Sequence, residues 1–341
     1  MIEKPKISFV CSIRNGFQHI KRCVKSVLNQ GYSDIELVLV DDYSDDSTWS
    51  LIEEIAKQDE RVRAIKNYGR EGLTYALNMG LDFARGEYIA RIDVDDFAHA
   101  DRAQKQLQAI EWTSGAVMAT SCFRVVDEED YEMYCHCPSS NHIVTKWSLC
   151  FRNNLRHSTV MWKRSLDLRY DPSFKYCQDY EMWCRISDMG SIVVVPETIV
   201  TIGDRKDSVT NTRHEIQEKY ADMVSSKRFF KYVDEHINEK ESRCLRMLYH
   251  LKNVDQLREF ESMDEQDLRT AIKNYMRLVN EFSKKEPIDD ESMAMEVHHD
   301  LRNMFLNKIQ GSKAKNIVCE EIKNYIESKP ILYAIEKSSA D

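Results

Sequence analysis

The sequence has no apolar run that approaches the roughly 18 residues of a membrane-spanning helix. The best candidate, residues 192–195, is interrupted by Pro196, and residues 1–6 contain no apolar signal segment. A secretory signal would need an apolar stretch of that kind near the amino terminus. We therefore expect a cytoplasmic protein.

Basic charge is also scarce. The chain has 341 residues with 48 Lys and Arg against 57 Asp and Glu, a net charge of -9, and it contains no long basic run. Domains that bind nucleic acids normally carry a basic patch or stripe. We therefore predict no nucleic-acid partner.

The ten cysteines form no repeated framework. The tightest group is Cys135-His136-Cys137, but no second pair stands at a spacing that would complete a zinc site. Reduced thiols in a cytosolic protein are the simpler interpretation.

Two glycine-rich nucleotide-binding signatures are missing. A dinucleotide-binding Rossmann fold needs G-x-G-x-x-G after its first strand, whereas this chain has Ser12-Ile13-Arg14-Asn15-Gly16 after the first predicted strand. The P-loop pattern G-x-x-x-x-G-K-[ST] is absent as well. These absences disfavour a dinucleotide-dependent dehydrogenase and a P-loop ATPase.

Apolar strands and amphipathic helices alternate in the first part of the chain. Strands are predicted at residues 7–11, 35–40, 62–66 and 88–92, and the segments between them repeat apolar residues at helical spacing. Strands joined in this way form a parallel sheet with helices on both faces. Further strands are expected at residues 116–126 and 192–195, whereas residues 127–141 look polar and turn-like.

Polar residues follow three of these strands, at positions 12–15, 41–42 and 93–96. In an open parallel sheet, ligands bind beyond the carboxyl ends of the strands, so these three stretches should meet at one crevice. On an extended chain, Asp93 and Asp95 would point to the same side. Two such carboxylates suit a hard cation, either Mg²⁺ or Mn²⁺.

Beyond about residue 205, glycine becomes rare and apolar residues recur at helical spacing. Residues 211–341 are therefore predicted to form a helical region. Its apolar faces favour packing within the protein over membrane binding, and the region is the candidate interface for a homo-oligomer. Members of these faces include Cys244, Leu245, Leu248, Leu251, Leu268, Ile272, Met276, Val279 and residues 304–309 and 317–326.

Several short motifs occur in a consistent order along the chain. They are Ser26-Val27-Leu28-Asn29-Gln30, residues 36–42 with Ser44 and Asp46, Gly72-Leu73 with Ala76-Leu77-Asn78 and Gly80, residues 86–96 with Arg102, Asn154 with His157 and Val160-Met161, and residues 178–183. Together they resemble the family-2 glycosyltransferases with the GT-A fold. The resemblance implies a GT-A domain over residues 1–210, with a nucleotide-sugar half (1–112) and an acceptor half (113–210). The helical region lies outside it.

In this family an inverting enzyme moves a sugar from a nucleotide diphosphate sugar to an acceptor hydroxyl with the help of Mn²⁺ or Mg²⁺. The resemblance implies that Asp95 ligates the metal and that Asp93 faces the ribose and the metal-bound water. It makes Asp179 the catalytic base. The remaining positions implied for the nucleotide sugar are Ser12, Ile13, Arg14, Asp41, Asp42, Arg70 and Val94, and those implied for the acceptor side are His157 and Gln178.

Two residues keep an alternative interpretation. Arg70 suits either a contact with the diphosphate or a solvated loop. His157 fits an acceptor-side position and a hydrogen-bonded core position equally well.

Two positions depart from the family pattern. Arg205 stands where many relatives have a histidine that approaches the metal or the diphosphate. Because a guanidinium pairs with phosphate but does not ligate metals, we expect Arg205 to support the leaving diphosphate. Tyr43 replaces the glycine that usually follows the aspartate pair, so its ring would crowd or stack on the base.

Two rival functions remain. One is a catalytically degenerate GT-A domain that serves as an assembly scaffold. The presence of Asp93, Asp95 and Asp179 together disfavours it. The other is a sugar nucleotidyltransferase, which would need a glycine- and basic-rich loop after the first strand. For the leading function we expect a UDP-linked donor and a glycan or lipid-linked acceptor. A lipid-linked acceptor would bring the enzyme to the inner face of the membrane.

Overall fold

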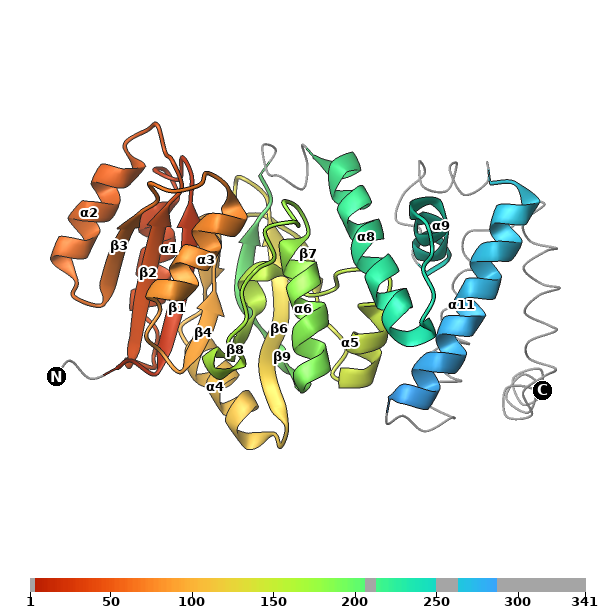
Figure 1. Ribbon diagram of the computed structural model, residues 1–341. Coiled ribbons are helices and arrows are strands. Elements are labelled where there is room, and N and C mark those ends of the chain that lie inside the picture. Colours follow the sequence, from red (N-terminus) through yellow and green to blue (C-terminus); the bar gives the residue numbers. More distant parts are fainter. Residues whose placement is uncertain (1–3, 206–212, 250–262, 287–341) are drawn as a thin grey trace. The chain divides into compact units, whose positions relative to one another are not determined.

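The computed structural model describes residues 4–205, 213–249 and 263–286. The chain divides into two compact units, one formed by Met1–Thr145 and Asn153–Gln217 and the other by Lys146–Arg152 and Glu218–Asp341. All the described strands belong to the first unit, and the second is built from helices (Figure 1).

Strands and helices alternate through the first half of the first unit. The strands are β1 (Ile7–Ile13), β2 (Ile35–Asp41), β3 (Val62–Lys66), β4 (Tyr88–Arg91), β5 (Phe97–Ala98), β6 (Ala116–Val126), β7 (Glu132–His136), β8 (Met161–Lys163) and β9 (Ser191–Gly203). The helices are α1 (Ile20–Leu28), α2 (Thr48–Gln58), α3 (Leu73–Phe83), α4 (Arg102–Trp112), α5 (His142–Ser148) and α6 (Gln178–Met189), and the 3-10 turns are η1 (His157–Thr159) and η2 (Arg164–Leu166).

The described strands form one sheet in the order β3-β2-β1-β4-β8-β6-β9-β5, with β7 paired to β6. Strands β1 to β4 pair in parallel, and so do β6 and β9, whereas β5, β7 and β8 are antiparallel to their neighbours. The predicted α/β class, with a helical region after it, is confirmed.

Helices cover both faces of the sheet because its strands are apolar on both sides. Alternate residues of β1 and β2, such as Phe9 and Leu37, pack in one cluster with side chains of α1, α2 and α4. The residues between them, Val38 and Val40, pack against Ala76 of α3 on the opposite face. The carboxyl ends of the parallel strands therefore stay uncovered by these helices.

Three details differ from the sequence-based expectations. The supposedly turn-like stretch 127–141 contains β7, which pairs with β6. The last strand runs from Ser191 to Gly203, past Pro196, because the register against β6 shifts next to that residue. Cys122 and Cys137 form a disulfide, so the expectation of reduced thiols is wrong for this pair. Each of these features depends on pairing with β6, which the local pattern of the segment does not show.

The second unit contains α8 (His214–Val233), α9 (Glu239–Tyr249) and α11 (Glu265–Lys285). Trp147 forms its aromatic centre, with ring centroids 4.8 Å from Phe151 and 5.1 Å from Phe282. The predicted apolar faces on α9 and α11 are buried. The expectations for Leu251 and for residues 304–309 and 317–326 lie outside the described residues.

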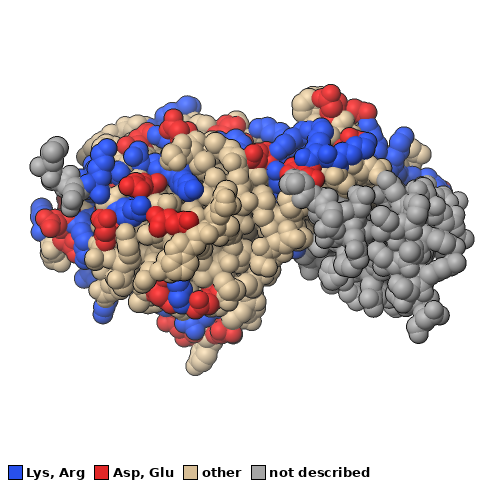
Figure 2. Space-filling model, turned by 90° about the horizontal axis from the view of Figure 1, so that it is seen from below, with Lys and Arg blue, Asp and Glu red and all other residues tan. Residues whose placement is uncertain are grey.

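No helix among the described residues is long and apolar enough to cross a membrane. On the face that Figure 2 shows, acidic and basic side chains lie around a broad uncharged area. The net charge is therefore not gathered into a single field on this face.

The close contact between α3 and the sheet provides a test of the packing. A Cβ atom added at Gly80 would lie 2.5 Å from Cγ1 of Val10. Alanine is the better helix former by roughly 1 kcal/mol, but overpacking costs about 1–3 kcal/mol. We expect Gly80→Ala to lower the free energy of unfolding in urea.

Gly31→Ala is the matched control, because its Cβ would meet only the Ala100 carbonyl oxygen at an ordinary 3.5 Å. Equal stability of the two variants would contradict the packing described here.

Candidate active site

Three aspartates follow β4 in a tight turn. The strand ends at Arg91, and the Asp96 N–H donates to the Asp93 carbonyl over 3.2 Å. The chain is therefore not extended at these residues, and the expectation that strand alternation aligns Asp93 with Asp95 is wrong. Their carboxylates nevertheless influence each other electrostatically, because the turn keeps them in one place.

Asp93 is held by a buried arginine. Arg91 is completely buried and forms an ion pair with the Asp93 carboxylate. The Ser158 hydroxyl donates to the same carboxylate over 3.1 Å and accepts the Asp93 N–H over 2.8 Å. Burial by itself would raise the pKa of Asp93, but the charge of Arg91 and the Ser158 hydrogen bond outweigh it and hold the pKa below its usual value. Asp93 is therefore ionised.

The pKa of Asp95 shifts in the opposite direction to that of Asp93. Burial and the neighbouring charge of Asp93 raise its pKa to about 6, although Arg205 opposes the shift. One Arg205 guanidinium nitrogen lies 3.7 Å from an Asp95 carboxylate oxygen. The chain reaches this point at Gly203, where an added Cβ would lie 3.0 Å from the Asp95 carbonyl oxygen. The end of β9 thus places Arg205 against Asp95, while its predicted role at the diphosphate stays a prediction.

Asp96 lies deeper. It is buried, and its carboxylate accepts the Gly203 N–H over 3.0 Å. Burial and the charges of Asp95 and Asp93 raise its pKa well above the usual value. Arg102 is also buried close by, and desolvation lowers its pKa to about 9 although the charge of Asp96 opposes the shift. Asp96 therefore connects β9 to the aspartate turn.

The turn after β1 packs against the same aspartate turn. A Cβ atom at Gly16 would lie 2.6 Å from Ile13 and 3.0 Å from Val94, so only glycine lets these two side chains close over the backbone. Ser12 is buried in β1, and the exposed Arg14 pairs with Glu71. The structure therefore brings the predicted residues Ile13 and Val94 together.

The two aspartates after β2 have different surroundings. Asp42 accepts hydrogen bonds from the Asn67 amide over 2.9 Å and from the Gly72 N–H over 3.1 Å. Asp41 is fully buried, and in the part of the chain that the structure describes, neither of its carboxylate oxygens has a hydrogen-bond partner. A buried carboxylate without donors is costly unless a ligand supplies them.

Tyr43 follows the aspartate pair with a left-handed backbone, at φ 59°. This is the conformation that glycine adopts freely, which explains the glycine of the family pattern. The Tyr43 hydroxyl donates to the Gly69 carbonyl over 2.8 Å, so the ring is fixed beside the loop at residues 67–72. Arg70 is exposed, and its guanidinium lies 4.8 Å from the centroid of the Tyr75 ring rather than against a carboxylate.

The acceptor-side residues gather next to Asp93. His157 shares a hydrogen bond of 2.8 Å with the Tyr170 hydroxyl, and burial lowers its pKa to about 3. Asp179, at the start of α6, accepts from the Asn153 amide over 2.7 Å. Burial raises the pKa of Asp179, and the charge of Asp93 adds to the shift. Gln178 is buried at the first position of α6.

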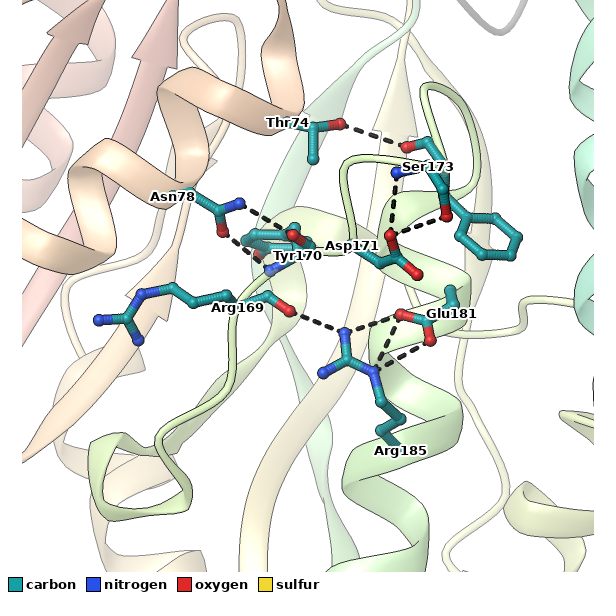
Figure 3. Close-up of polar contacts among 9 residues, drawn as sticks. Thr74, Asn78, Arg169, Tyr170, Asp171, Ser173, Glu181 and Arg185 are labelled. Atoms are coloured by element: carbon teal, nitrogen blue, oxygen red, sulfur yellow. Dashed lines mark hydrogen bonds and ion pairs between the residues drawn. The ribbon is translucent and has the colours of Figure 1, made fainter.

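The segment that carries Tyr170 is fixed between two helices (Figure 3). The Asn78 side chain on α3 donates to the Tyr170 carbonyl and accepts its N–H, both over 2.8 Å. On the other side, Arg185 of α6 donates to the Arg169 carbonyl over 2.8 Å and pairs with Glu181. The position of the Tyr170 hydroxyl thus depends on α3 and α6 together.

Sequence reasoning assigned no role to Arg91, Ser158, Tyr170 and Asn153. One signal existed for Arg91, because a charged residue inside an apolar strand needs a nearby carboxylate. The other three come from loops, and no local pattern shows which carboxylate a loop residue will meet.

The donor set suits a divalent cation that is shared with a substrate. Among the described residues, no three His, Cys, Asp or Glu side chains cluster closely enough to hold a metal ion by themselves. Asp93 and Asp95 repel each other, as the raised pKa of Asp95 shows, and a cation would relieve this repulsion. Oxygen ligands from a bound diphosphate would complete such a site.

Comparison with known proteins agrees with this geometry. Residues 8–162 match the model of Glycosyl transferase family 2. An uncharacterised glycosyltransferase of Haemophilus influenzae is 27% identical over 231 residues, which cover 63% of this chain and 70% of the relative. The glycosyltransferase GlyG of Streptococcus pneumoniae is 29% identical over 169 residues, which cover 50% of this chain and 55% of the relative.

The fold is also found among solved structures. Residues 1–349 of TarS from S. aureus, crystallised with UDP-GlcNAc, superpose with a TM-score of 0.55 at 13% identity, covering 95% of this chain and 92% of that chain. Residues 8–162 thus resemble glycosyltransferase family 2 in sequence, and the chain shares the fold of TarS. The protein is a glycosyltransferase, as the resemblance in its sequence indicated.

The contact of Asn78 with Tyr170 provides a test of the site's framework. Asn78→Ala removes two hydrogen bonds to buried backbone, each worth about 0.5–1.5 kcal/mol. We expect the free energy of unfolding in urea to fall by about 1–3 kcal/mol with an unchanged m value.

Thr74→Val serves as the comparison, since it removes one longer bond of 3.3 Å to the Phe174 carbonyl at nearly constant volume. A loss at Thr74 as large as that at Asn78 would contradict the dominant role of Asn78.

Proposed function

We propose that this glycosyltransferase moves a sugar, with inversion, from a UDP-linked donor to a hydroxyl of a glycan or lipid-linked acceptor. Mn²⁺ or Mg²⁺ would serve as cofactor. The observation that carries the proposal is the arrangement of three aspartates at one edge of the sheet. Asp93 is ionised beside Arg91, Asp95 has a raised pKa, and Asp179 stands close enough for the charge of Asp93 to raise its pKa.

The donor nucleotide would lie over the ends of β1 and β2. Asp41 would accept from N–H or O–H groups of the base or ribose, because its oxygens have no hydrogen-bond partner among the described residues. Asp42 fixes the loop 67–72 instead, through Asn67 and Gly72. Tyr43 offers a fixed ring for stacking. The UDP-GlcNAc complex of TarS, which has the same fold, supports the choice of a UDP-linked donor.

Asp95 and Asp93 would hold the divalent ion together with the donor diphosphate. When bound, such an ion neutralises the negative charge that develops on the leaving diphosphate. Arg205 is next to Asp95 and pairs with the same diphosphate through its planar guanidinium. The ion pair with Asp95 keeps Arg205 in place before the donor binds.

Asp179 would act as general base toward the acceptor hydroxyl. Burial raises its pKa toward the working pH, which makes the carboxylate a better proton acceptor. Asn153 orients the carboxylate by donating to one of its oxygens. Direct attack by the activated hydroxyl on the anomeric carbon inverts its configuration. We place this reaction in the cytoplasm, at the inner membrane face when the acceptor is lipid-linked.

The first test follows the release of free nucleoside diphosphate from a panel of UDP-, GDP- and dTDP-sugars. It is run with Mn²⁺ or Mg²⁺ and then with EDTA. We expect metal-dependent release from a UDP-sugar and its loss in Asp95→Asn, because the amide keeps the shape but lacks the charge that holds the metal.

Asp34→Asn is the control, since this exposed aspartate lies just before β2, at the amino end of the strands. Arg205→Ala should raise the donor KM or lower kcat. If it changes neither, Arg205 has no role at the diphosphate. If no nucleoside diphosphate is released from any donor and calorimetry finds no binding of UDP, GDP or dTDP with metal, the proposed activity is wrong.

The environment of Asp179 predicts a pH effect. The Asn153 hydrogen bond and the Tyr180 N–H lower its pKa, while burial and Asp93 raise it. Asn153→Ala therefore raises the pKa further, and a base with a higher pKa is protonated over a wider acid range. We expect the acid limb of the kcat profile to move to higher pH. An unchanged limb would remove Asp179 from the role of base.

A further inference from the structure

The β6–β7 hairpin displays aromatic side chains that the reaction described above does not use. Every residue of β7 is exposed, and Tyr134 keeps 42% of its surface accessible. Along a strand, alternate side chains share a face, so Tyr134 and His136 project to one side and Met133 and Cys135 to the other. The hairpin thus has an aromatic face and a separate sulfur-containing face.

The aromatic face is rigid. An Arg156 guanidinium nitrogen donates to the Tyr134 hydroxyl over 3.0 Å, and the same guanidinium lies 5.8 Å from the ring centroid of Phe123. Phe123 is buried in β6, and its ring centroid is 5.5 Å from that of His136. A ring held in this way loses little conformational entropy when a ligand binds to it.

This face borders the reaction centre. Arg156 immediately precedes η1, in which His157 meets Tyr170 and Ser158 holds Asp93. On the other side, β6 pairs with β9 up to Gly203, which lies against the Asp95 carbonyl. The exposed Tyr134 and Arg156 are therefore joined through short stretches of chain to both metal-site carboxylates.

We infer that Tyr134 and Arg156 form an acceptor subsite for a carbohydrate chain, in which a sugar ring stacks on Tyr134 while Arg156 donates to the sugar oxygens. The inference rests on the proposed function, and it names the acceptor as an oligosaccharide rather than a single sugar or a protein. The sugar that stacks on Tyr134 is not the one that carries the reacting hydroxyl at Asp179.

The chemistry of the two side chains carries this assignment. A pyranose ring has an apolar C–H face and a rim of hydroxyls, and it matches an aromatic plate beside a planar donor. Arg156 has five N–H donors, of which the Tyr134 contact uses one. A peptide strand would pair instead with the backbone of β7, and it would not depend on the Tyr134 ring.

The test measures direct binding and does not need the natural acceptor. Ladders of chito-, manno- and gluco-oligosaccharides, from one to six units, are titrated against the full chain by saturation-transfer NMR. We expect one of these oligosaccharide series to bind, with an affinity that rises with the number of sugar units. Tyr134→Ala should weaken this binding about tenfold, the size of one lost ring contact.

Two variants separate stacking from other effects. Tyr134→Phe keeps the ring and should retain most of the affinity, while Met133→Ala changes the opposite face of the same strand and should bind like the parent. Thermal unfolding checks that each variant is folded. With the best-bound ladder as acceptor, Tyr134→Ala should raise the acceptor KM more than it lowers kcat.

The inference is overturned if no ladder binds, if Tyr134→Ala binds like the parent, or if Met133→Ala loses as much affinity as Tyr134→Ala. If a peptide binds to the hairpin and Tyr134→Ala leaves this binding unchanged, the hairpin is assigned to a protein partner instead. Donor hydrolysis by the parent chain reports on the proposed function separately, so a failure of that activity is distinguishable from a failure here.

Discussion

The site depends on one buried charge. Arg91 has no exposed surface, and a guanidinium in such a place must be balanced by a carboxylate, because an unpaired buried charge costs several kcal/mol. Asp93 provides that balance and is thereby fixed at the end of β4. Arg102 helps to fix the position of Arg91, since it donates to the carbonyls of Arg91 and Val160. The strand, α4 and the segment around η1 are connected through these two arginines.

The same ion pair creates the electrostatic asymmetry of the turn. Three carboxylates within four residues repel each other, and Arg91 forms its ion pair with Asp93. Burial together with the remaining negative charge raises the pKa of Asp95 to about 6 and holds the pKa of Asp96 well above its usual value. Asp96 is stabilised by the Gly203 N–H inside the protein, whereas Asp95 stays partly exposed beside Arg205. Asp95 is therefore a carboxylate of the turn that the proposed function assigns to the divalent ion.

Local sequence patterns were enough to predict the first four strands, their helices and the polar strand ends. Each of these depends on residues that are near in the chain, such as the run before Asp93. The antiparallel strands β5 and β8 could not be predicted in this way, because they are short and form only against distant partners. The strand β7 pairs with the neighbouring β6, but it lies in a polar stretch whose pattern resembles a turn. The same limit applies to the site. Its aspartates stand at strand ends, but Ser158 and Tyr170 reach it from loops whose course the sheet determines.

A common rule connects the two aspartate pairs of the site. After β2, Asp42 binds Asn67 and Gly72 of the protein, and both oxygens of Asp41 are left without a donor. After β4, Asp93 binds Arg91 and Ser158, and Asp95 is left with a raised pKa. In each pair one carboxylate organises the backbone, and the proposed function assigns the other to the ligand. Because the first carboxylate fixes the loop around the second, the donor and its cation would meet a carboxylate already in position.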